Sequence, residues 1–308
     1  MSEIRTIMAE MRKKRRKHDA ELAQITETQM GIQTAFTFET MMTGGQGKTT
    51  GAAVRDIFLR RPDHLEEHAI QIEGILRGRF GVERTQAHLI WAANQTAHGD
   101  LHAALTGLTN DDLDSREGLP DGEWALRQIL EHLIVVERYY TLDIHHALKQ
   151  FHAGEPHGDL PDDELQVERP GATLAQLIQD HDDVRDEALT ALADLTEAEL
   201  RAPARWGEIA IDVRFLLMRF AHHEREHTDQ TLKWRLQRGR QQTEAERLLG
   251  LCWRQSGILE GHLIGAPEDI LDRDPGDGEW LVRRILAHIG SAETYFRRVI
   301  LKALEPVG

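Results

Sequence analysis

The sequence predicts an all-α protein made of two four-helix bundles. Apolar residues recur at helical spacing along most of the 308 residues, whereas runs of alternating β-branched residues are nearly absent. A chain of 308 residues also suits two domains of about 150 residues each. A histidine pattern that occurs twice along the chain, described below, leads to the same number of domains.

The composition argues against a nucleic-acid-binding, disulfide-bonded or membrane-spanning protein. The formal net charge of −15 argues against binding to nucleic acid, because that binding requires a surplus of Lys and Arg to neutralise phosphates. The basic run at residues 12–17 is expected to be a solvated helix face. Cys252 is the only cysteine, which excludes an intramolecular disulfide and fits a reducing cytoplasm. No run of about 18 apolar residues is present, so we expect no membrane partner.

Helical periodicity predicts eight helices, separated by stretches rich in Gly, Pro and Asp. Asp121 and Asp277 are expected to be the N-caps of the helices that follow them. The predicted helices cover approximately residues 4–24, 53–77, 84–107, 123–150, 173–193, 211–236, 244–263 and 279–304.

One helical segment is present twice. Residues 121–140 read DGEWALRQILEHLIVVERYY, and residues 277–296 read DGEWLVRRILAHIGSAETYF. Trp124 and His132 therefore match Trp280 and His288 at a constant offset of 156 residues. So many identities in register indicate a duplicated segment.

The other half of the repeating unit is duplicated as well. His64 and His68 match His223 and His227 at a constant offset of 159 residues. Each pair continues into a shared His-x2-Gln pattern. The two copies therefore share three histidines each, although the halves of one copy stand at opposite ends of the chain.

The order of the repeats predicts the domains. Residues 84–240 contain a complete set of four helices, whereas the two ends of the chain contain half a set each. An isolated helix pair buries its apolar face poorly, so we expect residues 1–83 and 241–308 to close into a second, circularly permuted bundle. A homodimer that exchanges the terminal halves between chains satisfies the same contacts, and both arrangements remain open.

The duplicated histidines have the spacing of metal ligands. His223 and His227 lie four residues apart and share one helix face, and an inward apolar stripe places His132 in the same core. Three neutral nitrogen ligands suit a divalent ion such as Zn, Ni or Fe and leave a coordination position open. His-x3-His pairs also arise by chance, so the evidence lies in two pairs at matching repeat positions.

Several neighbouring residues receive a structural interpretation. His98 and His102 form a third His-x3-His pair without a match in the other copy, so we expect them at the surface. Trp124 and Trp280 are expected to pack at the start of their helices. A structural ion pair would explain the repeated Glu137 and Glu293 as well as catalysis would. Three more glutamates are expected to be exposed rather than to orient an imidazole: Glu131, Glu224 and Glu226.

The permuted copy departs from the central one in two ways. Pro62 lies two residues before His64, where a proline fits only a first helical turn or a kink. The preceding connection is longer by about eleven residues and contains the glycine-rich residues 44–50. Met42 stands where a phosphate-binding loop needs Gly, so we expect a loop that could cover the histidines. Both departures favour loss of metal from this copy rather than from the central one.

The combination of Trp-x7-His with His-x3-His-x2-Gln resembles the DinB/YfiT-like superfamily of metal-binding four-helix bundles. In that family three histidines bind a divalent metal, one on the second helix and two on the fourth. The ligands that the resemblance implies are His132, His223 and His227 in the central copy and His288, His64 and His68 in the permuted copy.

The resemblance also implies a range of functions. Some family members resemble transferases and isomerases that act with low-molecular-weight thiols, and others have no assigned reaction. We therefore expect a cytoplasmic metalloprotein with a small-molecule substrate, acting as a thiol transferase or a hydrolase. The alternative is a non-enzymatic stress-related or ligand-binding bundle, because no nucleophile or acid–base pair in the sequence decides for an enzyme.

Overall fold

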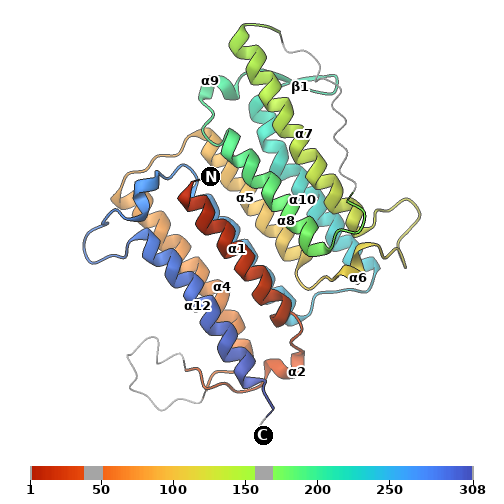
Figure 1. Cartoon of the computed structure of the whole chain (residues 1–308), viewed down its shortest axis with the longest axis vertical. Coiled ribbons are helices and arrows are strands. Elements are labelled where there is room, and N and C mark those ends of the chain that lie inside the picture. The colour runs from red at the N-terminus through yellow and green to blue at the C-terminus, as the bar shows by residue number, and fades with distance from the viewer. Residues whose placement is uncertain (1, 38–50, 157–168, 307–308) are drawn as a thin grey trace.

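The computed structural model describes residues 2–37, 51–156 and 169–306, which are mainly helical (Figure 1). Long helices occupy the regions where periodicity predicted them, so the all-α fold class is confirmed. The long helices are α1 (Glu3–Leu22), α4 (Val54–Glu73), α5 (Gln86–Leu105), α7 (Leu126–Ala153), α8 (Leu174–Leu192), α10 (Val213–Gln237), α11 (Glu244–Leu263) and α12 (Val282–Ala303). Shorter elements are α2 (Glu27–Met30), the π-helical η1 (Gly74–Arg79), α6 (Asn110–Leu113), α9 (Glu197–Leu200) and the 3-10 turn η2 (Glu268–Leu271).

Threonine side chains define several helix starts. Thr85, Thr173 and Thr243 precede α5, α8 and α11, and each accepts a hydrogen bond from a backbone N–H three residues further on. Such caps satisfy one of the N–H groups that have no partner within the first helical turn. The capping threonines therefore determine locally where these three helices begin.

The predicted N-caps Asp121 and Asp277 are wrong. The caps of α7 and α12 are Ala125 and Leu281, several residues further along the chain. Gly122 and Gly278 follow the two aspartates with φ angles of 87° and 77°, a left-handed backbone that cannot begin an α-helix. The aspartates therefore belong to turns ahead of the helices.

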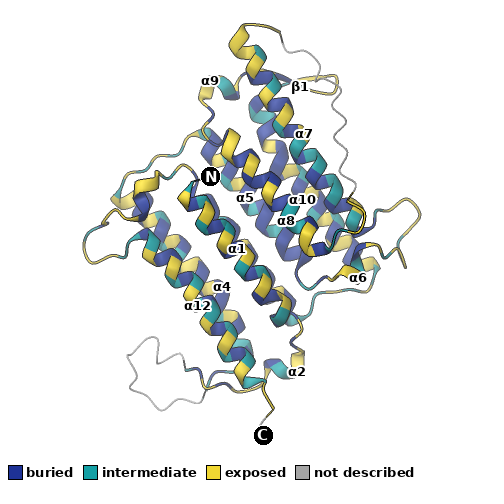
Figure 2. Cartoon of the chain, viewed as in Figure 1, coloured by how far each residue is buried: buried dark blue, intermediate teal, exposed yellow. Residues whose placement is uncertain are grey.

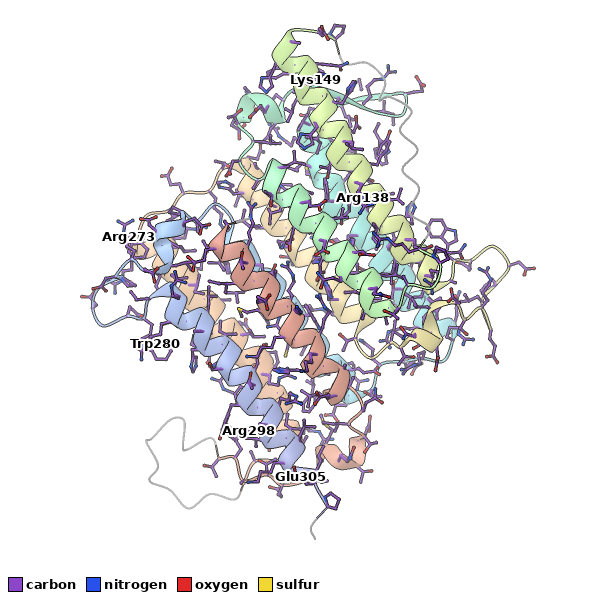
Figure 3. The ribbon with its side chains drawn as sticks, viewed as in Figure 1. Arg138, Lys149, Arg273, Trp280, Arg298 and Glu305 are labelled. Carbon is purple, nitrogen blue, oxygen red and sulfur yellow. The ribbon has the colours of Figure 1, made fainter. Side chains whose placement is uncertain are left out.

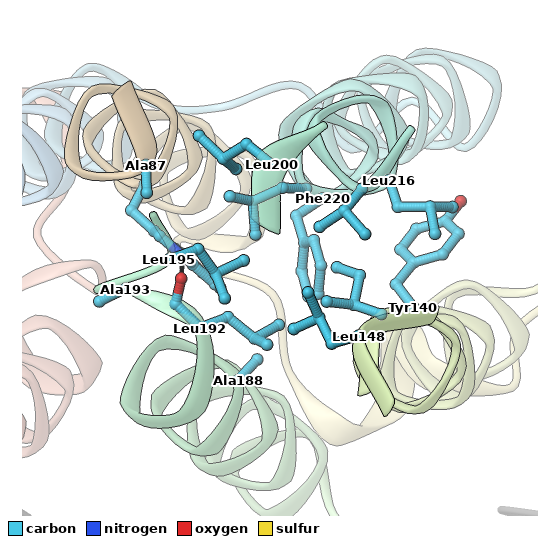
Figure 4. Packing of buried hydrophobic residues seen from close by; sticks show 14 of the residues in the cluster. Ala87, Tyr140, Leu148, Ala188, Leu192, Ala193, Leu195, Leu200, Leu216 and Phe220 are labelled. Atoms are coloured by element: carbon cyan, nitrogen blue, oxygen red, sulfur yellow. Dashed lines mark hydrogen bonds between the residues drawn. The ribbon is translucent and has the colours of Figure 1, made fainter. Parts of the chain in front are cut away.

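Four helices from the middle of the chain pack around one another. α10 contacts α5 and α7, and α7 contacts α8. Figure 4 shows part of the core between them, where Phe220 meets Leu148 and Tyr140. Leu130 and Leu133 of α7 are also buried, which confirms the inward stripe beside His132. Complete burial of an apolar side chain of this size contributes roughly 1.5–3 kcal/mol.

The helices from the two ends of the chain pack around one another as well. α4 contacts α11 and α12, and α1 contacts α12 and α11. Figure 1 shows α12 beside α1 and α4. Their buried faces form apolar clusters that include Met8, Leu65, Leu259 and Ile285. In the single chain, the N-terminal and C-terminal helix pairs therefore bury their apolar faces against each other.

α5 and α11 join the two sets of helices, and glycines allow them to approach closely. A Cβ atom on Gly99 would lie 2.6 Å from the carbonyl oxygen of Trp253. A Cβ atom on Gly257 would lie 2.4 Å from the carbonyl oxygen of Gln95. Any larger residue at either position would push the helices apart, so the seam requires glycine.

A short hairpin that the sequence reading missed precedes α10. Strand β1 (Pro203–Trp206) pairs antiparallel with β2 (Ile209–Asp212), with Pro203 opposite Asp212. The bridge between Gln33 and Ala53 occupies the corresponding place before α4. α4 and α10, which contain the duplicated His-x3-His pairs (the histidine-pair helices), thus begin directly after an antiparallel contact.

Pro62 lies inside α4 rather than in its first turn, so the first-turn alternative is wrong. Proline has no N–H, and the carbonyl of Phe58, four residues earlier, therefore lacks its usual helical partner. The helix nevertheless continues to Glu73, and η1 extends it further.

The basic run at 12–17 does not form the predicted solvated face. Arg12 is 4% exposed and Arg15 is 0% exposed, because α1 is covered on two sides. Arg15 pairs with Glu293 at 2.6 Å, and Arg12 pairs with Asp186 on α8 and with Glu260 on α11. These arginines connect helices instead of facing solvent.

α1 and α12 each have a buried and an exposed face, as Figure 2 shows. Within the described ranges, no helix combines the length and the apolar character needed to cross a bilayer.

Candidate metal centres

One cluster of histidines lies between α7 and α10, which pack side by side. α7 supplies His132, and α10 supplies His223 and His227 from successive turns. Their ligand nitrogens all lie within 4.8 Å of one another. The structure thus brings together the three residues predicted for the central copy.

The imidazole nitrogens of this cluster face one another. His223 Nε2 lies 3.2 Å from His132 Nε2 and 3.1 Å from His227 Nε2. Nitrogens bonded to one zinc ion at about 2.0–2.1 Å are themselves about 3.0–3.4 Å apart, depending on the coordination geometry. The spacing and the donor set therefore fit a single divalent ion.

Gln230 and Trp124 hold the ring of His227 in place. Gln230 Oε1 accepts a hydrogen bond from His227 Nδ1 at 2.7 Å, so the Nε2 of the neutral ring keeps its lone pair. Trp124 stacks on His227 with ring centroids 5.8 Å apart and also meets the edge of His132 at 4.8 Å. Trp124 therefore packs at the start of its helix as predicted, and the side chains that it packs against are these imidazoles.

A second cluster lies between α4 and α12, which also contact each other. α4 supplies His64 and His68, and α12 supplies His288. His64 Nε2 lies 3.0 Å from His288 Nε2 and 3.2 Å from His68 Nε2. The residues predicted for the permuted copy are therefore brought together as well, with the spacing of the first cluster.

The surroundings of the second cluster match those of the first. Gln71 Oε1 accepts a hydrogen bond from His68 Nδ1 at 2.8 Å. Trp280, labelled in Figure 3 at the start of α12, stacks on His68 with ring centroids 6.4 Å apart and meets His288 at 5.1 Å. Both clusters thus combine three imidazoles with one amide and one indole in equivalent positions.

An ion pair borders each cluster on its histidine-pair helix. Arg219 pairs with Glu226 at 3.3 Å on α10, and Arg60 pairs with Glu67 at 2.9 Å on α4. Glu226 is exposed as predicted. These pairs add another contact at matching positions of the two helices.

The two clusters differ in one aromatic neighbour. The ring of Tyr140 lies 6.0 Å from His223, whereas the ring of Phe296 lies 5.8 Å from His64. The Tyr140 hydroxyl accepts a hydrogen bond from Arg219 at 3.4 Å. Only the cluster between α7 and α10 therefore has this aligned phenol hydroxyl among the described residues.

Burial favours the neutral form of most of these imidazoles. Together with the neighbouring histidines of each cluster, it lowers the pKa of His223 and of His64 to about 4. Burial also lowers the pKa values of His132, His227 and His288. Neutral imidazole is the form that binds metal.

The prediction that His98 and His102 lie at the surface is wrong. They are 3% and 5% exposed, and both contact Asp182 of α8. Trp253 of α11 stacks on His102 with ring centroids 4.3 Å apart. The helices of the chain termini cover this face of α5, which the histidine spacing alone could not reveal.

The glutamates near the ligands divide into two kinds. Glu224 is 1% exposed, so the prediction that it lies at the surface is wrong. Its carboxylate accepts a hydrogen bond from His98 Nδ1 at 2.7 Å and pairs with Arg185, and these contacts offset its loss of water. Glu131 is half-buried. Glu137 also pairs with Arg185, as Glu293 does with Arg15, so both repeated glutamates form structural ion pairs.

The glycine-rich residues 44–50 lie outside the described residues, so the predicted covering loop stays a prediction.

Comparison with protein families gives a match over part of the chain. Residues 93–231, from the first turns of α5 to α10, match the DinB superfamily. No curated protein and no solved structure matches the chain. The matched segment contains the whole cluster of His132, His223 and His227, and such clusters fit a metal-binding helical protein. The similarity to the DinB superfamily therefore covers residues 93–231, which include the cluster between α7 and α10.

Proposed function

We propose that this protein binds a divalent metal ion, Zn, Ni or Fe, at one three-histidine site in each of two DinB-type bundles. The central bundle would comprise residues 84–240, and the second, circularly permuted bundle would comprise residues 1–83 and 241–308. The contacts of α1 and α4 with α11 and α12 support this division, as do the constant repeat offsets.

The observation that carries the proposal is the convergence of Nε2 atoms. His227 uses its Nδ1 proton on Gln230, so its Nε2 presents a lone pair to His223 at 3.1 Å. Lone pairs that face each other repel unless a proton or a cation lies between them. The same arrangement recurs around His68 and Gln71, which makes a cation the simpler explanation.

We propose that the central site carries an activity on a small-molecule substrate, as a thiol S-transferase or a hydrolase. When bound, a divalent ion supplies the positive charge that lowers the pKa of a thiol or water and polarises an electrophile. Arg219 orients the Tyr140 hydroxyl next to His223, where it can donate a hydrogen bond to a substrate. Trp124 covers one side of the imidazoles and limits access of water there.

The permuted site has Phe296 in the corresponding position, so it lacks this hydroxyl. We therefore propose that it binds metal without carrying out the reaction. Loss of the central site should therefore abolish the reaction, whereas loss of the permuted site should remove bound metal only.

The test is to load the full chain with Co²⁺ and to add glutathione or cysteine while recording the visible absorption spectrum. The proposal predicts a spectral change, and the double variant His223→Ala/His227→Ala should lose the part of it that arises at the central site. The matched variant His64→Ala/His68→Ala should retain the change at the central site. An unchanged spectrum with both thiols would contradict the thiol reaction and favour a non-enzymatic binding protein.

A further inference from the structure

A group of metal-ligating side chains lies apart from the two three-histidine clusters. His98 and His102 project from one face of α5, and Asp182 projects from α8. Their exposed fractions are 3%, 5% and 1%. A buried cluster of two imidazoles and a carboxylate requires an explanation, because each polar group must be paired to offset its loss of water.

The three ligand atoms lie at the spacing of a bound ion. His98 Nε2 and His102 Nε2 are 3.2 Å apart, and each lies 2.9 Å from Asp182 Oδ1. Bonds of about 2.0–2.2 Å to one divalent ion separate neighbouring ligand atoms by about 3.0–3.4 Å. The distances in this cluster therefore resemble those in the three-histidine clusters.

Surrounding side chains orient these ligands. Glu224 Oε1 lies 2.7 Å from His98 Nδ1, which leaves Nε2 of a neutral ring directed at Asp182 and His102. The second oxygen of Asp182 contacts the guanidinium group of Arg16. A carboxylate that accepts the distal N–H of a ligating histidine is a common support of metal sites.

The charges of the buried network favour a cation. Among the described residues, its carboxylates outnumber its guanidinium groups by two, and one divalent ion bound by neutral imidazoles balances that excess. The carboxylates are Glu137, Asp182, Asp186, Glu224 and Glu260, and the guanidinium groups belong to Arg12, Arg16 and Arg185.

A small cavity of about 10 Å³ adjoins the imidazoles, which is about the volume that one water molecule requires. Ser256 Oγ and Gln95 Oε1 are buried, belong to residues that line this cavity, and have no hydrogen-bond partner within the described structure. A larger cavity of about 320 Å³ borders His102 and Trp253 and offers a route for an ion. These unpartnered atoms are an independent sign that the site is built for an additional group.

We propose that His98, His102 and Asp182 bind a third divalent transition-metal ion, with a water molecule as a further ligand. Arg12 and Arg16 of α1 and Trp253 of α11 surround the site. The ion therefore stabilises the seam between the terminal helices and the central ones. Nitrogen and carboxylate ligands suit Zn²⁺, Co²⁺ or Fe²⁺.

The test uses the full chain with His64→Ala, His68→Ala, His223→Ala and His227→Ala, which removes both three-histidine clusters. The protein is loaded with Zn²⁺ at pH 8, desalted and analysed for metal, and circular dichroism monitors its fold. The proposal predicts one equivalent of Zn²⁺ per chain. Addition of His102→Gln should remove that equivalent, whereas His181→Gln, a buried histidine next to Asp182 in sequence, should retain it.

A folded four-alanine variant without bound Zn²⁺ would overturn the proposal and indicate that protons alone balance the network. Equal Zn²⁺ content with and without His102→Gln would overturn it too. If His102→Gln prevents folding, the absorption spectrum of the Co²⁺-loaded four-alanine variant decides, because a four-coordinate ion held by two imidazoles, a carboxylate and water gives d–d bands that are much more intense than those of aqueous Co²⁺. Neither result depends on metal in the three-histidine clusters.

Discussion

Gln230 Oε1 lies 2.7 Å from His227 Nδ1, and this hydrogen bond determines which nitrogen of His227 faces the other imidazoles. Gln230→Leu removes the acceptor and frees the ring to turn or to change tautomer. We expect the affinity of the central site for Zn²⁺ to fall about 10–100-fold, as is typical for loss of such a supporting group. Competition with a chromophoric chelator measures this change.

Gln71→Leu is the matched control for that variant. Gln71 has the same contact with His68 at 2.8 Å, so its loss should weaken the permuted site and leave the central affinity unchanged. Unaltered affinities in both variants would show that the amides do not orient the ligands.

Arg185→Met should destabilise the fold strongly. Arg185 Nη2 lies 2.8 Å from Glu224 Oε2, and Arg185 Nε lies 3.0 Å from Glu137 Oε2, all within the core. Loss of the guanidinium leaves two buried carboxylates without their partner, which typically costs about 3–5 kcal/mol. Urea unfolding in the presence of a chelator measures the free energy.

The exposed pair of Arg201 and Glu197, 3.4 Å apart, provides the comparison. Arg201→Met should change the free energy of unfolding by less than about 1 kcal/mol, because water screens such pairs. If Arg185→Met and Arg201→Met lower the free energy of unfolding by similar amounts, burial does not increase the contribution of Arg185 to stability.

Acidification should destabilise the protein through His18. Burial lowers the pKa of His18 to about 4; the nearby Glu293 opposes this shift, and Arg297 and Arg61 reinforce it. In the unfolded chain the imidazole takes up a proton near pH 6.5, so the unfolded state binds more protons between pH 6.5 and 4. The contribution of neutral His18 to stability is therefore complete above pH 6.5 and is lost as the pH falls towards 4.

The variant His18→Leu isolates this effect. Its free energy of unfolding should fall less than that of the natural protein between pH 7 and pH 5 when both are measured with a chelator. Parallel pH profiles would assign the acid sensitivity to other groups.

The thiol of Cys252 should resist modification in the folded protein. Cys252 is 1% exposed, and burial raises its pKa to about 12, so almost no thiolate exists at pH 8. Reaction with a disulfide reagent should proceed at the rate of unfolding and accelerate in urea. Rapid stoichiometric reaction in native buffer would disprove the burial of this thiol.

The sequence predicted the long helices well because their signals are local. Apolar periodicity located α7, and the repeated Trp-x7-His segment identified His132 and His288 together. The two three-histidine clusters could be predicted because each histidine pair is fixed by helical spacing. The hairpin of β1 and β2 escaped prediction because strands of four residues leave too short a pattern.

Burial between helices distant in sequence could not be predicted in the same way. His98 and Arg12 resemble surface residues locally, and only the packing of α1 and α11 against the central helices encloses them. Glu224 was misjudged for the same reason, because its partners Arg185 and His98 come from other helices.

The metal content of the purified full chain tests the central claim most directly. Compared with the natural protein after the same loading with Zn²⁺, His223→Ala/His227→Ala should hold one equivalent less per chain. His64→Ala/His68→Ala should also hold one equivalent less. If both folded variants retain all the metal of the natural protein, the three-histidine clusters are not metal sites and the account is wrong.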